Sequence, residues 1–194
     1  MSKASKASSQ VEEAVSIFLN GLQLEAHPET IGTPRRVSQM WSENLVSGYR
    51  DTPASVLRDT IQDESDTTVV LEHIPFHGIC PHHLVPFFGT VDLCYEPRGR
   101  IVGLGALEKL VAVLSRRLTL QETLTGQLVD ALMTELDARG AACKITGQHL
   151  CLMLRGREPR GTSVITYAFR GSLENAYAVF STPKCETTLT SCGG

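Results

Sequence analysis

Apolar residues recur every three or four positions near the start of the chain, which is the period of an amphipathic helix. The first such stretch covers residues 11–22. A second helix is predicted to begin at Thr33-Pro34, because threonine is a good cap and proline suits the first turn, and to end near Gly48. Its apolar face carries Val37, Met40, Trp41 and Leu45. We therefore expect an N-terminal helical region over residues 11–50.

A second pair of helical patterns lies in the middle of the chain. The first has an apolar stripe made by Leu107, Leu110, Val111 and Leu114. The next is predicted to begin at Thr119, because threonine followed three residues later by Glu122 is the pattern of a capping box. Its leucines continue at helical spacing, and Gly140 is placed to end it.

Four stretches instead alternate apolar and polar residues, as half-buried strands do. They cover residues 68–76, 88–96, 141–154 and 163–169. In the first stretch, strict alternation places His73 on the same face as Leu71 and places Ile74 on the other. In the third, it places His149 and Cys151 on one face.

The elements follow one another as two helices, two strands, two helices and two strands. Strand pairs that flank a helix pair indicate an α+β fold, with an antiparallel four-stranded sheet, two helices on one face and the N-terminal helices before it. We expect this main domain over residues 68–180, a polar connection over 51–67, a disordered tail over 1–10 and a flexible tail over 181–194. One copy would leave the sheet edges uncovered, which favours an oligomer.

Composition narrows the class of protein. Of 194 residues, 42% are hydrophobic and 20% are charged, which is ordinary for a globular protein. A net charge of −3 argues against general nucleic-acid binding, and no apolar run is long enough for a membrane span. The chain start has no secretory leader, so six cysteines indicate a reducing, cytoplasmic setting and metal or catalytic use. Cys185 and Cys192, in the last stretch, suggest no function.

Two short segments carry soft metal ligands. Residues 80–83 are Cys-Pro-His-His, and residues 149–151 are His-Leu-Cys. Sulfur and nitrogen donors favour Zn²⁺ over the oxygen-seeking Mg²⁺ and Ca²⁺. A lone cysteine is usually a small buried hydrophobe, but two such segments favour a metal site. His82 as a fourth ligand would make a closed structural site, whereas a catalytic site would keep an open position and use three ligands: Cys80, His83 and Cys151.

In combination, these motifs resemble those of the GTP cyclohydrolase I family. Residues 80–83, followed by Pro-Phe-Phe-Gly at 86–89, resemble the family's Cys-Glu-His-His and Pro-Phe-x-Gly. Gln-Glu-Thr-Leu-Thr at 121–125 resembles a second motif, and the His-Leu-Cys segment with a following Arg-Gly resembles a third. Further similarity lies in Ile-Val-Gly-Leu at 101–104 and in Thr-Pro-Arg-Arg-Val at 33–37. The resemblance runs in unbroken order over roughly residues 10–180.

The resemblance implies a tunnelling fold (T-fold) that assembles into a homodecamer with active sites at subunit interfaces. It also implies a zinc-dependent hydrolase whose partner is a guanine nucleotide rather than nucleic acid or a membrane. The family opens the imidazole ring of GTP at C8, releases formate and forms 7,8-dihydroneopterin triphosphate, in pterin and tetrahydrofolate biosynthesis. Zinc suits this hydrolysis because it lowers the pKa of water to about 7.

The resemblance also assigns roles to individual residues. Cys80, His83 and Cys151 would hold the zinc ion. His149 would protonate the leaving nitrogen with assistance from His82, since an imidazole titrates in the range that such a step needs.

Four further residues would contact the nucleotide. Glu122 matches the glutamate that binds the paired N–H donors of guanine, although capping of its helix is the alternative. Gln121 stands next to it in the same motif. Arg155 matches an arginine that meets the phosphates, and Lys109 stands where the family usually has an arginine.

The chain departs from the family mainly where the phosphates bind. Gly105-Ala106 replaces the usual Ser-Lys, and Pro81 replaces the glutamate after the first cysteine. The metal ligands, the proton donor and the guanine contact are kept. Two alternatives therefore stand beside the leading one: a specialised paralog that hydrolyses a modified or less phosphorylated guanine nucleotide in secondary metabolism, and a non-catalytic, zinc-stabilised binding module.

Overall fold

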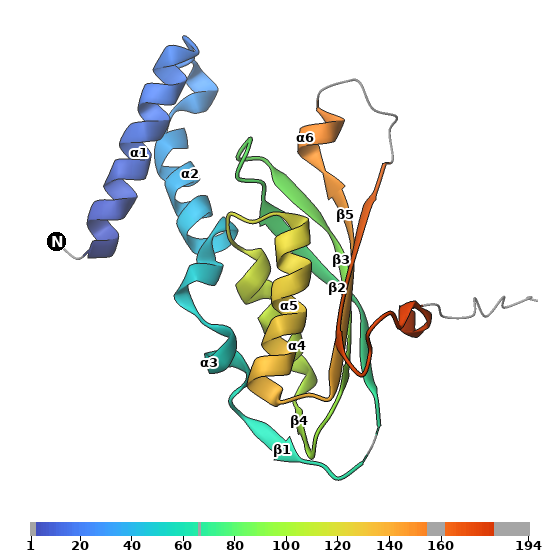
Figure 1. Cartoon of the computed structure of the whole chain (residues 1–194). Helices are drawn as coiled ribbons and strands as arrows, with labels where there is room; N and C mark the ends of the chain where they lie inside the picture. The colour runs from blue at the N-terminus through green and yellow to red at the C-terminus, as the bar shows by residue number, and fades with distance from the viewer. Residues whose placement is uncertain (1–2, 66, 155–161, 181–194) are drawn as a thin grey trace, which may run out of the picture.

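The computed structural model describes residues 3–65, 67–154 and 162–180 (Figure 1). Its α-helices are α1 (Lys3–Gly21), α2 (Thr33–Met40), α3 (Pro53–Leu57), α4 (Leu104–Ser115), α5 (Gln121–Leu136) and α6 (Leu150–Met153). Its strands are β1 (Thr60–Gln62), β2 (Val69–Ile79), β3 (Pro86–Glu96), β4 (Arg100–Val102), β5 (Gly140–His149) and β6 (Val164–Gly171). Shorter helical turns are η1 (Pro28–Thr30), η2 (Trp41–Leu45), η3 (Ser47–Arg50) and η4 (Tyr177–Phe180).

The N-terminal helices α1 and α2 lie side by side and project beyond one end of the sheet (Figure 1). α1 begins at Lys3, so the disordered tail predicted over residues 1–10 is wrong for residues 3–10. Alanine and lysine in this stretch are good helix formers and extend the helix backwards. α2 begins at Thr33, close to the predicted start, but the prediction that Thr33 caps it is wrong, because the cap residue is Gly32, which offers no side chain. No helix among the described residues is long and apolar enough to cross a membrane.

The main sheet has the strand order β2-β3-β5-β6, and each neighbouring pair is antiparallel. All four strands were predicted from alternation, and α4 and α5 lie together on one face (Figure 1). The predicted α+β architecture with an antiparallel sheet is therefore confirmed. β3 and β5 pair without interruption from Phe87 opposite His149 to Glu96 opposite Gly140, so the two predicted metal-binding segments lie at the same end of the sheet.

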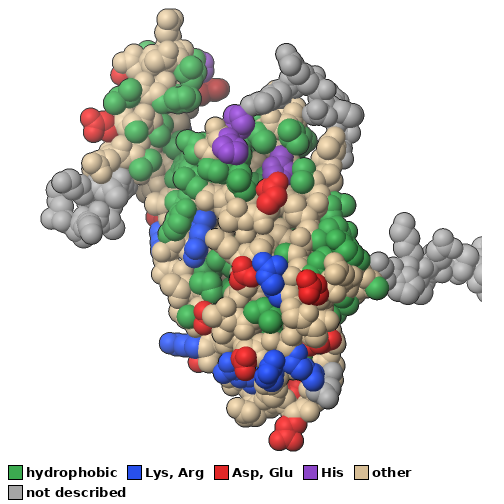
Figure 2. Space-filling view, viewed as in Figure 1, with side chains coloured by type: hydrophobic (Ala, Val, Ile, Leu, Met, Phe, Trp, Pro, Cys, Tyr) green, Lys and Arg blue, Asp and Glu red, His purple; other side chains and the backbone are tan. Residues whose placement is uncertain are grey.

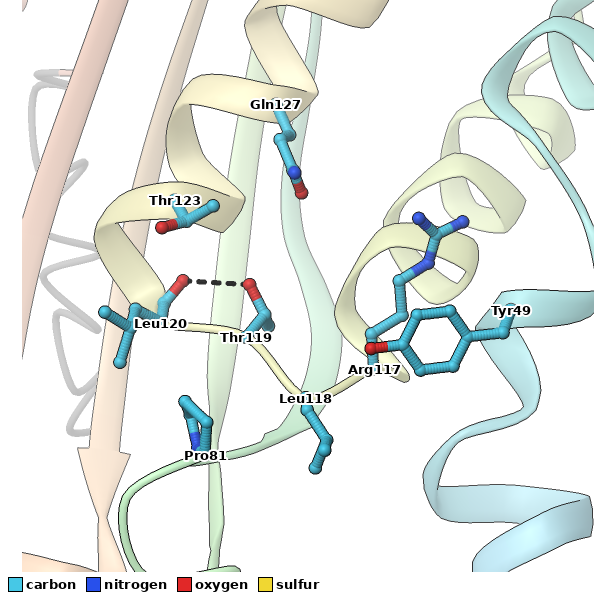
Figure 3. A pocket seen from close by; sticks show the side chains of 8 residues that line it. All are labelled: Tyr49, Pro81, Arg117, Leu118, Thr119, Leu120, Thr123 and Gln127. Carbon is cyan, nitrogen blue, oxygen red and sulfur yellow. Dashed lines mark hydrogen bonds between the residues drawn. The ribbon is translucent and has the colours of Figure 1, made fainter.

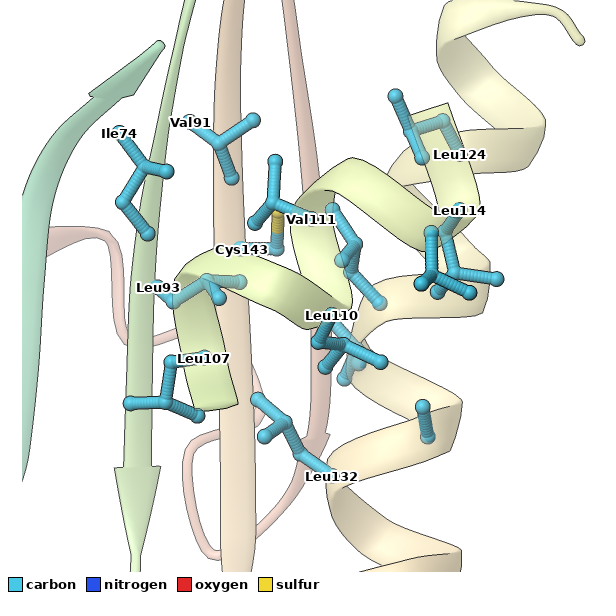
Figure 4. Close-up of a cluster of buried hydrophobic side chains, with 14 of the residues drawn as sticks. Ile74, Val91, Leu93, Leu107, Leu110, Val111, Leu114, Leu124, Leu132 and Cys143 are labelled. Carbon is cyan, nitrogen blue, oxygen red and sulfur yellow. The ribbon is translucent and has the colours of Figure 1, made fainter. Parts of the chain in front are cut away.

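The core lies between this sheet and the two helices (Figure 4). Every leucine and valine of the predicted α4 stripe is buried there, facing Ile74, Val91 and Leu93 of the sheet. Cys143 is also part of this core, and burial raises the pKa of its thiol well above the usual value, so it remains a neutral packing residue. Truncating one of these buried leucines to alanine would cost about 2–5 kcal/mol.

A β-bulge in β2 reverses the predicted alternation. The register against β3 shifts between Leu71 and Ile74, and His73 adopts a φ of 60°. The Asp92 carboxylate, itself held by Lys144 at 3.1 Å, accepts the His73 backbone N–H at 2.8 Å and stabilises this unusual conformation. One extra residue in the bulge returns Ile74 to the core face, on the same side as Leu71. The predicted placement of Ile74 opposite Leu71 is therefore wrong.

The segment over residues 51–67, predicted as a polar connection, contains two short elements. α3 begins with a capping box in which Thr52 and Ser55 each bond the backbone of the other. Its residues Val56 and Leu57 are buried in the core. β1 then pairs with β4 as a separate two-stranded sheet. Elements of three to five residues are too short for an apolar period to reveal them.

Both predicted ends of α5 differ from the structure. Its cap residue is Leu120, which makes no side-chain bond, and the Thr119 hydroxyl donates instead to the Leu120 carbonyl at 3.2 Å. The predicted capping box is therefore not formed. At the other end, Asp137 adopts the left-handed conformation that ends the helix, with a φ of 50°, and Gly140 already begins β5.

Candidate metal centre and active site

The loop between β2 and β3 forms one half of the candidate metal centre. Pro81 restricts the backbone directly after Cys80, and the Leu84 amide donates to the Cys80 carbonyl at 2.9 Å. The Cys80 amide in turn donates to the Val85 carbonyl at 3.0 Å. Leu84 has a left-handed φ of 55°, which closes the turn. These bonds hold the buried Cys80 and the exposed His83 on one tight loop.

The other half of the centre lies where β5 ends. The ladder with β3 ends at the pair Phe87 and His149. The chain then makes the single turn of α6, closed by the Leu154 amide on the Leu150 carbonyl at 2.9 Å. The prediction that Cys151 continues the strand is therefore wrong, because it lies in α6. The turn still brings Cys151 to the β2–β3 loop.

The predicted ligand group comes together in the structure. The sulfur atoms of Cys80 and Cys151 and a ring nitrogen of His83 all lie within 4.8 Å of one another. A tetrahedral ion with bonds of about 2.3 Å to sulfur and about 2.0 Å to nitrogen needs donor separations of about 3.5–3.8 Å. The group therefore fits a metal ion after a shift of roughly 1 Å, and three donors leave one position of a tetrahedron open.

His82 lies on the same loop without joining this group. Its side chain is exposed, and its ring centroid is 6.3 Å from that of His83, edge to face. The close group contains only Cys80, His83 and Cys151 among the described residues. Histidine side chains gather at this end of the molecule, near α6 (Figure 2).

The ring of His149 is fixed by two neighbours. It stacks on the Phe87 ring with a centroid distance of 4.9 Å and an interplanar angle of 11°. Its Nε2 atom lies 2.8 Å from the Oε1 atom of Gln121. Burial lowers the pKa of the His149 imidazole below its usual value of 6.5, and the carboxylate of Glu122 opposes this shift. An oriented, half-buried imidazole therefore stands beside the ligand group.

Gln121 was predicted to contact substrate, but its side chain is buried and forms hydrogen bonds with groups of the protein itself. The residue is 1% exposed. Its amide nitrogen donates toward the carbonyls of Ile145 and Val164, at 3.2 and 3.0 Å, and toward the Thr166 hydroxyl at 3.1 Å. The amide oxygen faces His149. Sequence motifs gave no indication of this orientation.

Glu122 has the freedom that a substrate contact needs. It is exposed on the first turn of α5 and makes no hydrogen bond among the described residues. The capping alternative predicted a bond to the helix start, which is not present. The positive end of the helix dipole favours a carboxylate here, and the charge of Glu122 acts against the lowering of the pKa of His149.

Of the two predicted phosphate contacts, only Lys109 lies among the described residues. Lys109 pairs with Asp51 at 3.7 Å, beside a cavity of about 290 Å³ that none of the metal-binding residues lines. Gly105 is exposed on the first turn of α4, and the methyl group of Ala106 packs against the core. Arg155 lies outside the described residues.

A second cavity, of about 280 Å³, opens beside the metal-binding loop (Figure 3). The guanidinium of Arg117 stands over the Tyr49 ring at 5.4 Å and donates to the Gly48 carbonyl at 2.9 Å. Sequence analysis missed this cavity because separate segments form its walls, which are Tyr49, Pro81, Arg117, Leu118, Thr119, Leu120, Thr123 and Gln127.

Comparison with known proteins agrees with the geometry. The sequence model of the family described as GTP cyclohydrolase I matches residues 11–182. The chain belongs to the GTP cyclohydrolase I family. The GTP cyclohydrolase 1 of Wolinella succinogenes is 37% identical over 163 residues, which cover 83% of this chain and 87% of that protein. The GTP cyclohydrolase 1 of Bacillus cytotoxicus is 35% identical over 174 residues, which cover 89% of this chain and 92% of that protein. The GTP cyclohydrolase 1 of Dehalococcoides mccartyi is 40% identical over 148 residues, which cover 75% of this chain and 78% of that protein.

Membership of the GTP cyclohydrolase I family makes this protein a hydrolase of the GTP cyclohydrolase I type. The family resemblance seen in the sequence is thereby confirmed. The Cys-His-Cys group supplies the place at which such an enzyme could hold a metal ion.

Proposed function

We propose that the protein is a zinc-dependent enzyme that opens the imidazole ring of GTP at C8, releases formate and forms 7,8-dihydroneopterin triphosphate. The observation that carries this proposal is the Cys80, His83 and Cys151 group beside the oriented ring of His149. Two thiolates and an imidazole are a donor set for zinc rather than for magnesium or calcium. When bound, zinc lowers the pKa of water to about 7 and so supplies a nucleophile at neutral pH.

His149 provides the proton that the leaving nitrogen needs. Release of C8 as formate breaks its bonds to both N7 and N9 and consumes two water molecules, and each nitrogen departs far more readily once it has accepted a proton. His149 gives the proton that goes to N7. Phe87 and Gln121 hold the imidazole in one orientation for this transfer. His82, exposed on the neighbouring loop, is the second imidazole able to take up or give a proton there.

Glu122 selects the guanine base. Its exposed carboxylate accepts from the N1–H and the 2-amino group of guanine, which form a paired-donor edge. Adenine presents no such pair, so a charged acceptor would lose its partners, at a cost of about 1–3 kcal/mol or more. The same residue therefore provides binding and specificity without taking part in the bond changes.

The proposal is tested by adding GTP to zinc-loaded protein, to metal-stripped protein and to stripped protein after zinc is restored. We expect formate and a fluorescent pterin from the first and third samples only. The variant His149→Ala is the matched control, because it should keep zinc and lose turnover by about 10²–10⁴-fold. Turnover that survives complete removal of metal would refute the zinc dependence.

One observation favours a second candidate, a paralog that acts on a less phosphorylated or modified guanine nucleotide. Lys109 is paired with Asp51, and Gly105-Ala106 offers no side-chain donor where the family usually has two. A charge-assisted hydrogen bond is worth about 1.5–3 kcal/mol, so each missing donor weakens binding of phosphate by about 10- to 150-fold. Comparing kcat/KM for GTP, GDP and GMP in the wild type and in Ala106→Lys separates the two candidates.

We further propose that the protein assembles as a homodecamer, with active sites at subunit interfaces and each sheet forming one segment of a tunnelling-fold barrel. Both edge strands, β2 and β6, lack a partner on one side within the described sheet. The exposed sheet face carries Val70, Ile165 and Tyr167, each more than 40% exposed. Such edges and apolar faces need covering. Light scattering on the purified protein tests the assembly.

The cellular setting follows from the same chemistry. None of the four cysteines among the described residues forms a disulfide, and a thiolate metal site is maintained best in a reducing cytosol. We therefore place the enzyme in the cytoplasm, in pterin and tetrahydrofolate biosynthesis.

A further inference from the structure

The side chain of Gln121 has only one amide orientation that satisfies its neighbours. Two of its neighbours, the carbonyl oxygens of Ile145 and Val164, can only accept hydrogen bonds. The amide nitrogen must therefore face them, and the amide oxygen must face Nε2 of His149 at 2.8 Å. Gly147 is required for this arrangement, because a Cβ atom at that position would collide with the amide oxygen.

Two buried hydroxyl groups reinforce the same orientation. The Thr125 hydroxyl donates to the Gln121 backbone carbonyl at 2.7 Å, which can only accept. In the 2.7 Å contact between the two threonines, Thr166 must then be the donor and Thr125 the acceptor. The Thr166 oxygen is left to accept at 3.1 Å, and it shares the two N–H groups of the Gln121 amide with the two carbonyls. The two hydroxyl protons therefore each have a single direction, and such networks strengthen each member.

The orientation of the Gln121 amide determines which nitrogen of the neutral His149 ring carries the proton. Because the Gln121 oxygen can only accept, Nε2 of His149 must be the N–H. The other nitrogen, Nδ1, is then bare, and it makes no hydrogen bond within the part of the chain that the structure describes. In the doubly protonated ring, Nδ1 is the atom that can release its proton without breaking the bond to Gln121.

We propose that Gln121 is a positioning residue that fixes the neutral tautomer of His149, so that Nδ1 exchanges the proton with the substrate. The proton passes from Nδ1 to the departing N7, the electron pair of the N–H bond stays on Nδ1, and Nε2–H stays bonded to Gln121 throughout. The proton-donor role of His149 rests on the proposed function, whereas the tautomer rests on the hydrogen bonds alone.

The tautomer is measured directly by ¹⁵N NMR of zinc-loaded protein labelled at histidine, with the His149 signals assigned by their loss in His149→Ala. At a pH where the ring is neutral, the wild type should show a protonated Nε2 and a bare Nδ1. In Gln121→Met, which keeps the length of the side chain and removes both polar atoms, the single tautomer should be lost. Thr125→Val is the matched control, because it removes buried bonds of the same network while the two carbonyls still orient the amide.

Kinetics complete the test. We expect kcat to fall by about 10- to 100-fold in Gln121→Met, the usual cost of losing a residue that orients a functional side chain, with zinc content and KM unchanged. Thr125→Val should keep the tautomer and lose less kcat than Gln121→Met, because the two carbonyls still orient the amide. The wild-type tautomer is measured without any variant, so the proposal stays testable even if Gln121→Met proves unstable.

Three results would overturn the proposal: a wild-type ring protonated at Nδ1, an unchanged tautomer in Gln121→Met, or an equal loss of kcat in Thr125→Val. Failure of the proposed function is distinguishable from these. It would appear as a wild-type protein with the expected tautomer that releases no formate from any guanine nucleotide.

Discussion

Replacement of Phe87 by leucine tests whether the structure holds His149 through its stacking partner. Phe87 is 1% exposed and makes two ring contacts, one with His149 at 4.9 Å and one with Phe76 at 5.7 Å. Each aromatic pair is worth about 0.5–1.5 kcal/mol beyond its buried area. Phe87→Leu keeps an apolar side chain of similar volume and loses both pairs, so the free energy of unfolding should fall by about 1–3 kcal/mol.

Phe76 provides the matched control for this change. It is buried on β2 and shares the edge-to-face contact with Phe87, but it makes no ring contact with His149. Phe76→Leu therefore loses one pair, and the free energy of unfolding should fall by about 0.5–1.5 kcal/mol. Denaturant unfolding of both single variants and of the double variant completes a double-mutant cycle, which measures the interaction free energy between Phe76 and Phe87.

The functional outcome should differ between the two variants. In Phe87→Leu the imidazole of His149 keeps its bond to Gln121 and loses the surface that fixes its plane, so kcat should fall by about tenfold or more while zinc content stays complete. Phe76→Leu should keep kcat within about twofold of the wild type. The reasoning is refuted if Phe76→Leu loses as much activity as Phe87→Leu at equal metal content.

Three further outcomes are expected. Cys151→Ala should bind no zinc, whereas Cys143→Ala, which empties a buried thiol site in the core, should be less stable and keep its zinc; metal analysis of the purified variants distinguishes them. Glu122→Gln should lose its preference for guanine over adenine nucleotides and melt at the wild-type temperature, because the carboxylate makes no capping bond; a lower melting temperature with unchanged preference would contradict this. Burial lowers the pKa of His77 below its usual 6.5, so the unfolded chain takes up the proton more readily and stability should decrease as the pH falls through 6.5 toward the folded pKa. His77→Gln should flatten that decrease in a denaturation series over pH.

Much of the fold could be predicted because its apolar periods are long and uninterrupted. The α4 stripe and the alternation of β3 each span enough residues to fix both the element and its buried face. The Cys-His-Cys group was also predictable, because Cys80 and His83 are close in sequence and the second segment has the same donors. The pairing of β3 with β5 then brings Cys151 to them.

The remaining features depend on contacts that no local pattern encodes. The bulge at His73 depends on Asp92, which lies on another strand. The orientation of Gln121 depends on the carbonyls of β5 and β6. Lys109 had the charge expected of a phosphate contact, but Asp51, from the segment before α3, binds it in the folded subunit. Long-range polar pairs of this kind are visible only in three dimensions.

The central claim, hydrolysis of a guanine nucleotide at C8, is tested most directly with GTP that carries ¹³C at that position. Zinc-loaded protein is incubated with the labelled nucleotide, and the products are followed by ¹³C NMR together with pterin fluorescence. The account predicts that all of the label appears as formate, in an amount equal to the pterin formed. Label that remains in a purine or pterin ring, or a zinc-loaded protein that leaves GTP, GDP and GMP unchanged, would contradict it.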